Sequence, residues 1–219
     1  MRRGLFITFE GSEGCGKSTQ VARLAARLRG SGQEVLLTRE PGGTPIGEKI
    51  RDLLQFDPVG AAMHPETELL LFEASRSQLV REVIQPALER GMLVISDRFY
   101  DSTTVYQGVA RRLDPHTVQQ LNAFAVGDCR PDLTFLLDVD VATARARMLR
   151  RVRPVNSTPD RMEQEPVEFY ERVCAAYRQL AEREPERVHC LDGSGSADEI
   201  EERIWQLIQS AISNQKSAI

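Results

Sequence analysis

The sequence predicts an α/β fold with three layers, in which a five-stranded parallel sheet carries helices on both faces. Short apolar, β-rich runs alternate along the chain with longer segments whose apolar residues recur at helical spacing. Strands that alternate with helices form parallel sheets joined by right-handed crossovers. The residues of strongest chemical character follow directly after predicted strands, where such sheets bind ligands.

Five segments have the apolar, β-branched composition of buried strands. They are residues 4–10, 34–38, 92–96, 133–139 and 188–191. The predicted helices are residues 17–29, 45–55, 66–89, 101–108, 115–126, 141–151, 166–183 and 197–212. In the first of these helices Val21, Leu24 and Leu28 share one face, and Gly91 follows the end of the third.

Composition indicates one globular domain over residues 1–219, with an inserted lid at about 147–163. The hydrophobic fraction of 41% and the charged fraction of 27% are ordinary for a globular protein. A net charge of −4 argues against a general nucleic-acid binder, which needs a basic face. The four cysteines form no C-x-x-C pair, no apolar run is long enough to cross a bilayer, and no signal peptide is evident. We therefore expect a cytoplasmic protein that binds neither nucleic acid nor membrane.

The segment after the first predicted strand has the pattern G-x-x-x-x-G-K-[ST]. Gly11, Gly16, Lys17 and Ser18 occupy its fixed positions. Backbone N–H groups of such a loop converge on phosphate oxygens, the following helix adds the positive end of its dipole, and the lysine reaches the β- and γ-phosphates. The sequence therefore predicts that ATP binds to Gly11, Ser12, Glu13, Gly14, Cys15, Gly16, Lys17, Ser18 and Thr19.

A Mg²⁺ site is expected beside this loop. The Ser18 hydroxyl is a predicted ligand, and Asp97 follows the third apolar strand, where many phosphate-binding loop enzymes place a metal-holding carboxylate. A role for Asp97 as a helix cap or as a structural partner of Arg98 is the alternative.

Arginines are concentrated in and near the predicted loops. Transfer between two phosphates gathers negative charge, which bidentate guanidinium groups neutralise well. The candidates near the strand ends are Arg39, Arg51, Arg76 and Arg98, and those near the lid are Arg147, Arg150, Arg151 and Arg153. A solvated surface face is the alternative for each of them. The proline-interrupted stretch 150–159 suits a lid that closes over ATP and excludes water.

Several strings in this chain resemble the thymidylate kinase family, and the resemblance runs over nearly its whole length. They are F-E-G-S-E-G-C-G-K-S at 9–18, T-R-E-P-G-G-T at 38–44, D-R-F-Y-D-S at 97–102 and Y-Q-G at 106–108. The second and third are not general features of nucleotide kinases. The resemblance implies the nucleoside monophosphate kinase fold and transfer of the γ-phosphoryl group of ATP to dTMP, with Mg²⁺ as cofactor.

The resemblance also implies roles for individual residues. Phe72 would stack on thymine, Arg76 would hydrogen-bond its carbonyl edge, and Thr103 and Gln107 would complete the base pocket. Tyr106 would lie against the deoxyribose. Arg98, with Arg39 or Arg51 nearby, would bind the acceptor phosphate. Glu13 would face the sugar 3′-hydroxyl and the monophosphate. On sequence alone, core packing is an alternative for Phe72.

Gly14 stands where one form of the family has a loop arginine, so the chain resembles the bacterial form in which the lid supplies the catalytic arginine. Arg153 is the candidate for that role. The resemblance further implies a homodimer.

Two other functions stay open at this point. A kinase of the same fold could act on another acceptor, such as UMP or CMP, and a nucleotide-binding regulator could hold ATP without transferring phosphate. No N-K-x-D guanine-recognition string is present, which argues against a GTPase.

Overall fold

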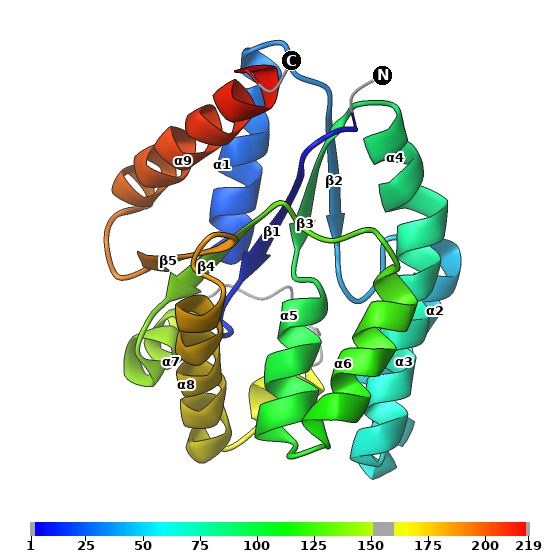
Figure 1. Ribbon diagram of the computed structural model, residues 1–219. Helices are drawn as coiled ribbons and strands as arrows, with labels where there is room; N and C mark the ends of the chain where they lie inside the picture. Colours follow the sequence, from blue (N-terminus) through cyan, green and yellow to red (C-terminus); the bar gives the residue numbers. More distant parts are fainter. Residues whose placement is uncertain (1–2, 151–159, 218–219) are drawn as a thin grey trace.

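A computed structural model of the protein describes residues 3–150 and 160–217 (Figure 1). Its sheet has five parallel strands in the order β2-β3-β1-β4-β5. The strands are β1 (Phe6–Glu10), β2 (Val35–Arg39), β3 (Leu93–Asp97), β4 (Leu133–Asp138) and β5 (Val188–Asp192). The predicted α/β class, with a five-stranded parallel sheet, is confirmed.

Helices and helical turns connect these strands. They are α1 (Lys17–Gly30), α2 (Pro45–Gln55), α3 (Pro65–Leu79), α4 (Gln85–Glu89), α5 (Tyr100–Thr103), α6 (Pro115–Val126), α7 (Val141–Arg150), α8 (Val167–Arg183) and α9 (Ala197–Ser217). Two short 3₁₀ turns are η1 (Pro58–Ala62) and η4 (Arg161–Gln164), and two π-helical turns are η2 (Val80–Ile84) and η3 (Thr104–Ala110).

β1 lies at the centre of the sheet and is buried on both faces. Alternate strand residues point in opposite directions. Ile7 and Phe9 therefore pack with α1 and α9, whereas Phe6 packs with η2 and α4. Burial on both sides explains why the strand is apolar throughout instead of alternating with polar residues.

The two faces of the sheet carry different helices (Figure 1). α1 and α9 lie side by side on one face, where they cover the central strands. α3, η2 and α4 pack on the opposite face together with η3 and α8. The three-layer arrangement follows from this division.

Two predicted helices contain π-helical turns that periodicity did not reveal. The predicted helix 66–89 is α3, η2 and α4 in succession, and the Gln85 N–H donates to the Val80 carbonyl five residues earlier. Pro86 lacks an N–H, so a local widening of the helix next to it is physically reasonable. The predicted helix 101–108 is α5 followed by η3, which extends to Ala110.

The segment predicted as a lid is only partly described. Residues 147–150 form the last turn of α7, and residues 161–164 form η4. Arg151 and Arg153 lie outside the described residues, so the structure does not test the role expected for Arg153.

The sheet topology brings the predicted site residues to one edge. β1 and β3 are neighbours in the sheet, and the loop at 11–16 and the segment beginning at Arg98 both follow their carboxyl ends. β2, which ends at Arg39, is the next strand beyond β3. A crevice at these strand ends is where sheets of this kind bind ligands.

Candidate active site

The loop between β1 and α1 needs glycine at its turning points. Gly11, Gly14 and Gly16 have φ values of 134°, 77° and 103°, a region that residues with a Cβ rarely adopt. A Cβ on Gly11 would lie 2.5 Å from the Leu137 carbonyl oxygen, and a Cβ on Gly14 would lie 2.4 Å from the Ala144 carbonyl oxygen. The loop is therefore pressed against β4 and α7 and has no room there for side chains.

Lys17 begins α1 and turns its ammonium group back into the loop. Nζ donates hydrogen bonds to the carbonyl oxygens of Gly11 at 3.0 Å and Ser12 at 2.8 Å, and the side chain is buried. This places a positive charge inside the curve of the loop, beside the positive end of the α1 dipole. The arrangement suits an anion with several oxygens.

Ser18 and Asp97, the two predicted metal ligands, are in direct contact. The Ser18 hydroxyl donates to Asp97 Oδ2 at 2.8 Å, although the two residues are 79 positions apart in sequence. Thr19 is exposed in the first turn of α1. A hydroxyl and a carboxylate at this spacing offer the hard oxygen donors that Mg²⁺ prefers.

Arg98 spans the crevice from the end of β3 to the loop after β1. Its backbone has a φ of 71°, which is unusual for a residue with a side chain and places it in a sharp turn. The guanidinium group donates to the Gly11 carbonyl at 3.1 Å and to Ser102 Oγ at 3.1 Å, and it pairs with Glu13. Arg98 and Glu13, far apart in sequence, therefore form one charged pair at the mouth of the crevice.

Glu10 ends β1 with a buried carboxylate that the sequence analysis did not single out. It accepts hydrogen bonds from the Phe99 N–H at 2.8 Å, Ser102 Oγ at 2.6 Å and the Tyr177 hydroxyl at 2.7 Å. Burial raises the pKa of Glu10. The carboxylate ties the first loop to the turn that carries Arg98. The sequence signal that could have identified Glu10 is its position as an acidic residue at the end of an apolar strand.

Arg39 and Arg51 add positive charge on the β2 side of the crevice. Arg39 pairs with Glu48 at 2.8 Å, and Arg51 donates to the Pro41 carbonyl at 3.0 Å. Burial and the nearby charge of Arg39 lower the pKa of Arg51. Two guanidinium groups that repel each other in a partly buried site favour an anion between them.

The predicted base-pocket residues lie on two facing helical segments. Phe72 and Arg76 are one turn apart on α3, and Thr103 and Gln107 are one turn apart across α5 and η3. Arg76 donates to Thr103 Oγ1 at 3.0 Å, which joins the two segments. Phe72 is only partly buried and belongs to none of the core clusters, so the core-packing alternative for this residue is not supported.

Arg76 is held by a buried network. All of its N–H groups donate to protein acceptors: Glu40 at 2.9 and 2.7 Å, Glu73 at 2.8 Å, Asn122 at 3.2 Å and Thr103. Burial outweighs the attraction of Arg76 and raises the pKa of Glu40 to about 7. If Arg76 donates a hydrogen bond to a base, as predicted, one of its N–H groups must therefore be shared between the base and a protein acceptor.

Tyr106 and Gln107 complete this part of the site. The Tyr106 hydroxyl lies 3.3 Å from Arg98 NH2, and the Arg98 guanidinium carbon lies 5.1 Å from the centre of the Tyr106 ring. Gln107 is buried, and its Nε2 donates to Glu68 Oε1 at 2.7 Å. Tyr106 and Gln107 thus connect Arg98 at the strand ends with the residues of α3.

A model of the thymidylate kinase family matches residues 9–204 of this chain. The chain belongs to the thymidylate kinase family. This match covers the first loop, the turn at Arg98, the two helical segments that carry the predicted base-pocket residues, and residues 147–163, which the sequence predicts as a lid.

Individual members of the thymidylate kinase family are similar along most of their length. The thymidylate kinase of Deinococcus radiodurans is 47% identical over 208 residues, which is 95% of this chain and 98% of that protein. The thymidylate kinase of Geobacter sulfurreducens is 49% identical over 196 residues, or 89% of this chain and 92% of that protein. The crystal structure of thymidylate kinase from Ehrlichia chaffeensis is 34% identical, has a TM-score of 0.75, and covers 94% of this chain and 99% of that chain.

Two further members of the predicted thymidylate kinase site have well-defined places. Cys15 is a free cysteine buried in the core cluster that includes α1, and its Sγ lies 3.5 Å from Lys17 Nζ. Arg147 on α7 donates to the Gly193 carbonyl at 2.8 Å, so its side chain braces the turn after β5.

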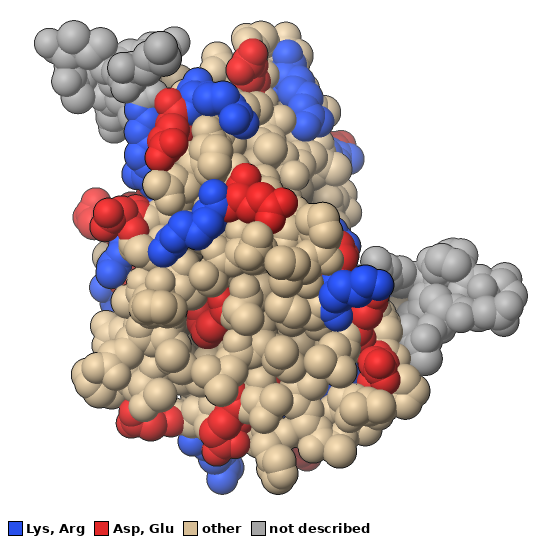
Figure 2. Space-filling view, turned by 90° about the vertical axis from the view of Figure 1, so that its right-hand side faces the viewer, with Lys and Arg blue, Asp and Glu red and all other residues tan. Residues whose placement is uncertain are grey.

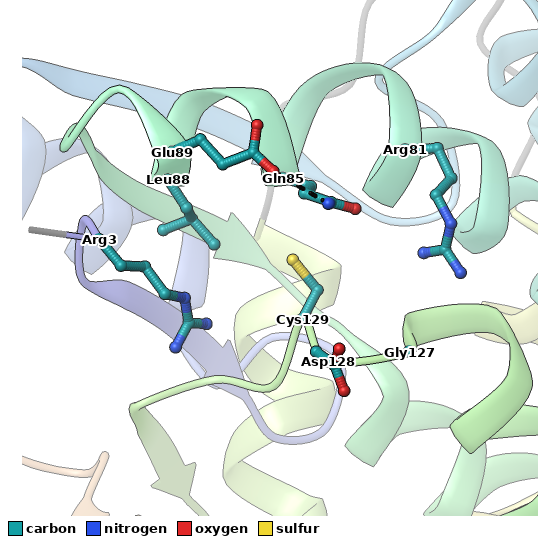
Figure 3. Close-up of a pocket in the computed structure, with 8 residues that line it drawn as sticks. All are labelled: Arg3, Arg81, Gln85, Leu88, Glu89, Gly127, Asp128 and Cys129. Carbon is teal, nitrogen blue, oxygen red and sulfur yellow. Dashed lines mark hydrogen bonds between the residues drawn. The ribbon is translucent and has the colours of Figure 1, made fainter. Parts of the chain in front are cut away.

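A separate hollow lies at the opposite end of the sheet, where the strands begin (Figure 3). Its volume is about 500 Å³, and it is lined by Arg3, Arg81, Gln85, Leu88, Glu89, Gly127, Asp128 and Cys129. The two arginines are balanced by two acidic residues, so the hollow has no net charge preference. We assign it no part in the chemistry of the strand-end crevice.

Within residues 3–150 and 160–217, no helix is long and apolar enough to cross a membrane.

Proposed function

We propose that this chain phosphorylates dTMP to dTDP with the γ-phosphate of ATP. Membership of the thymidylate kinase family supports the assignment. The single observation that carries it is that Lys17 and Arg98 both donate hydrogen bonds to the glycine loop, while Arg98 also contacts Tyr106 next to the predicted base-pocket residues. Phosphoryl transfer requires mainly positioning and charge stabilisation, and both are built into this arrangement.

The ATP phosphates would bind in the loop. Backbone N–H groups of residues 11–16 and the first turn of α1, including Ser18 and Thr19, would surround the β- and γ-phosphates. Lys17 Nζ would exchange its loop carbonyls for phosphate oxygens, which carry more negative charge. We expect Lys17 to stabilise the charge that develops on the transferred group.

Ser18 and Asp97 would hold Mg²⁺. Their direct contact at 2.8 Å supports a shared cation, since both supply oxygen ligands. A bound Mg²⁺ would neutralise phosphate charge, and Asp97 would then act as its carboxylate anchor.

The acceptor phosphate would lie between Arg98 and the pair Arg39 and Arg51. Arg98 is already oriented toward the loop, so it would orient the acceptor phosphate toward the γ-phosphate. Glu13, which pairs with Arg98, would contact the sugar 3′-hydroxyl and limit the free movement of that arginine.

The thymine base would stack on Phe72, with Arg76, Thr103 and Gln107 at its polar edge. The exposed part of Phe72 offers an aromatic face for stacking. Tyr106 would lie against the deoxyribose, where its ring already contacts Arg98.

We further propose that residues 1–219 form a single kinase domain whose lid, at about 147–163, supplies a catalytic arginine such as Arg153. The geometry at Gly14 supports a lid origin. A side chain there would collide with the Ala144 carbonyl of α7, so an arginine at position 14 would not fit this loop.

A coupled assay of ADP release tests the assignment. The purified protein is mixed with ATP, Mg²⁺ and one monophosphate at a time: dTMP, dUMP, CMP, GMP or AMP. We expect the highest kcat/KM with dTMP. Turnover of CMP, GMP or AMP in place of dTMP would assign a different acceptor, and ATP binding without ADP release for every monophosphate would indicate a regulator.

We propose that the protein forms a homodimer and that it is located in the cytoplasm. The face formed by α2, α3 and α6, with α3 between the other two, has few charged side chains over its centre (Figure 2). Leu70 of α3 is 55% exposed and Phe124 of α6 is 81% exposed. Large exposed apolar side chains on a charge-poor face favour self-association. Unpaired cysteines agree with a reducing compartment.

A further inference from the structure

Glu68 is a buried carboxylate to which the proposed reaction assigns no role. It lies on α3, and its side chain is 1% exposed. Gln107 Nε2 donates to it at 2.7 Å, Arg111 Nε donates to it at 3.2 Å, and Arg161 NH2 forms an ion pair with it. A carboxylate buried this deeply is destabilising unless it is paired and hydrogen-bonded, and these three donors supply that compensation.

The two arginines keep Glu68 ionised. Burial alone would raise the pKa of Glu68, but Arg111, Gln107 and Arg161 together lower it below its ordinary value. An ionised carboxylate can accept hydrogen bonds but cannot donate them. The Gln107 amide must therefore turn its NH₂ group toward Glu68, because its carbonyl oxygen would meet only another acceptor there.

This contact sets the direction of the whole Gln107 amide. With one N–H held by Glu68, the carbonyl oxygen Oε1 and the second N–H have fixed positions. The contact to Glu68 uses only Nε2 and leaves Oε1 out of that hydrogen bond. The amide thus offers one acceptor and one donor in a defined order.

The amide lies at the edge of the proposed base pocket. Glu68, Phe72 and Arg76 follow one another at four-residue intervals on α3, so they share one face of that helix. The hydrogen bonds Glu68–Gln107 and Arg76–Thr103 join α3 to the opposing segment on either side of Phe72. A base stacked on Phe72 would therefore meet the Gln107 amide at its edge.

Thymine and cytosine present opposite patterns to such an amide. Thymine has an N3–H donor beside the O4 acceptor, whereas cytosine has an N3 acceptor beside an amino donor. An amide fixed in one orientation can pair with one pattern and leaves buried polar groups unpaired against the other. An amide that is free to flip could pair with both.

We propose that Glu68 is a specificity-determining positioning residue, which fixes the Gln107 amide in the orientation that pairs with thymine and rejects cytosine. This inference rests on the proposed dTMP kinase function. It concerns discrimination between two pyrimidine bases and makes no use of the phosphate-binding groups.

The variant Glu68→Gln tests the inference. The NH2 groups of Arg111 and Arg161 contact Oε2 of Glu68, so they would hold the new carbonyl oxygen at that position. The new NH₂ group would then stand at the Oε1 position facing Gln107, which favours the flipped amide. We measure kcat/KM for dTMP and for dCMP in the coupled assay. The expected result is a fall of about tenfold or more in the dTMP/dCMP ratio of kcat/KM.

Glu165→Gln is the matched control. Glu165 accepts from the same Arg111 at 2.5 Å, and the structure records no contact between it and Gln107. We expect Glu165→Gln to keep the wild-type ratio. A folded Glu68→Gln protein with the wild-type ratio, or an equal fall in Glu165→Gln, overturns the inference.

Thermal melting shows whether Glu68→Gln is folded. If it is not, the variant Gln107→Met provides an independent test. Gln107→Met removes the amide and should lower the same ratio. If Gln107→Met retains full discrimination, the amide is not the reader and the inference fails. A wild-type protein that does not phosphorylate dTMP overturns the proposed function itself, which separates the two failures.

Discussion

Many functional side chains in this protein contact residues that are distant from them in sequence. Lys17 is the clearest case, since its ammonium group is enclosed by the loop that precedes it. Glu10 and Glu40 are buried acids whose environment, rather than their residue type, sets their protonation.

Replacing Lys17 with alanine should lower kcat by about 10²- to 10⁴-fold. The ammonium group supplies positive charge at the phosphates, and the methyl side chain of alanine cannot replace that charge. Steady-state ADP release at saturating ATP and dTMP measures the effect. Lys49→Ala, at an exposed position on α2, is the control and should retain full activity. Near-normal turnover of Lys17→Ala would exclude Lys17 from the phosphate site.

The buried acid Glu40 should make stability depend on pH. Its pKa rises from 4.5 to about 7 on folding, because burial disfavours the charged form more than Arg76 favours it. The native state therefore holds a proton that the unfolded state has lost between these values, so this contribution to stability is largest below pH 4.5 and falls as pH rises to 7. The total change is roughly 3 kcal/mol.

Urea unfolding of the wild type and Glu40→Gln across pH 4 to 8 checks this. Glutamine resembles the protonated acid, so the difference in unfolding free energy isolates Glu40. We expect the wild type to lose stability relative to Glu40→Gln as pH increases. A constant difference, or one that rises with pH, would show that Glu40 is charged in the native state.

At the scale of secondary structure, buried ion pairs dock the functional helices on the sheet. Asp101 of α5 is fully buried and receives Arg187, from the turn before β5, at 2.7 and 2.9 Å. Arg187 also donates to Thr134 of β4 at 2.8 Å. α5, which follows Arg98 closely, is thereby fixed to β4 and to the start of β5.

Removing Arg187 should cost much stability. In Arg187→Met, Asp101 remains buried without its partner, so we expect a loss of about 3–5 kcal/mol in unfolding free energy by urea titration. Arg178→Met provides the comparison, because Arg178 pairs with Asp138 at 2.8 Å but is 51% exposed. That variant should lose less than about 1 kcal/mol. Equal losses for both variants would mean that the buried pair has no special role.

In the molecule as a whole, the proposed active site and the charge-poor face lie on different parts of the surface. The predicted site residues follow the carboxyl ends of the strands, whereas α2, α3 and α6 form one side of the molecule (Figure 1). α3 belongs to both, since it carries Phe72 on one side and Leu70 on its exposed side. Association through this face would therefore brace the helix that holds the base pocket.

Introducing charge into this face should separate the subunits. Phe124→Glu places a carboxylate on the exposed side of α6, where it would be desolvated by a partner. Sedimentation equilibrium should give twice the chain mass for the wild type and the single chain mass for Phe124→Glu. Leu149→Glu on α7, where the leucine is 88% exposed, should leave the mass unchanged. A monomeric wild type would contradict the proposed homodimer.

Much of the fold followed from local patterns. The strands were placed within one or two residues, because a buried parallel strand is apolar throughout and glycine or proline marks its ends. The glycine loop was equally accessible, since its positive φ values restrict the residue type at each turn. The π-helical turns were missed because a single widened turn hardly changes the apolar periodicity, and Pro86 beside η2 was not read as a sign of one.

The alternation of strands and helices, the phosphate-binding loop, and the family resemblance of the short strings around it could all be read from the sequence. Which charged groups meet depends on how the elements pack. Glu10 faces Ser102 and Tyr177, and Glu68 faces Gln107, across 92, 167 and 39 positions of sequence. The physical reason is that periodicity and turn chemistry act between neighbours along the chain. Protonation states and amide orientations instead depend on burial and on partners that packing brings together.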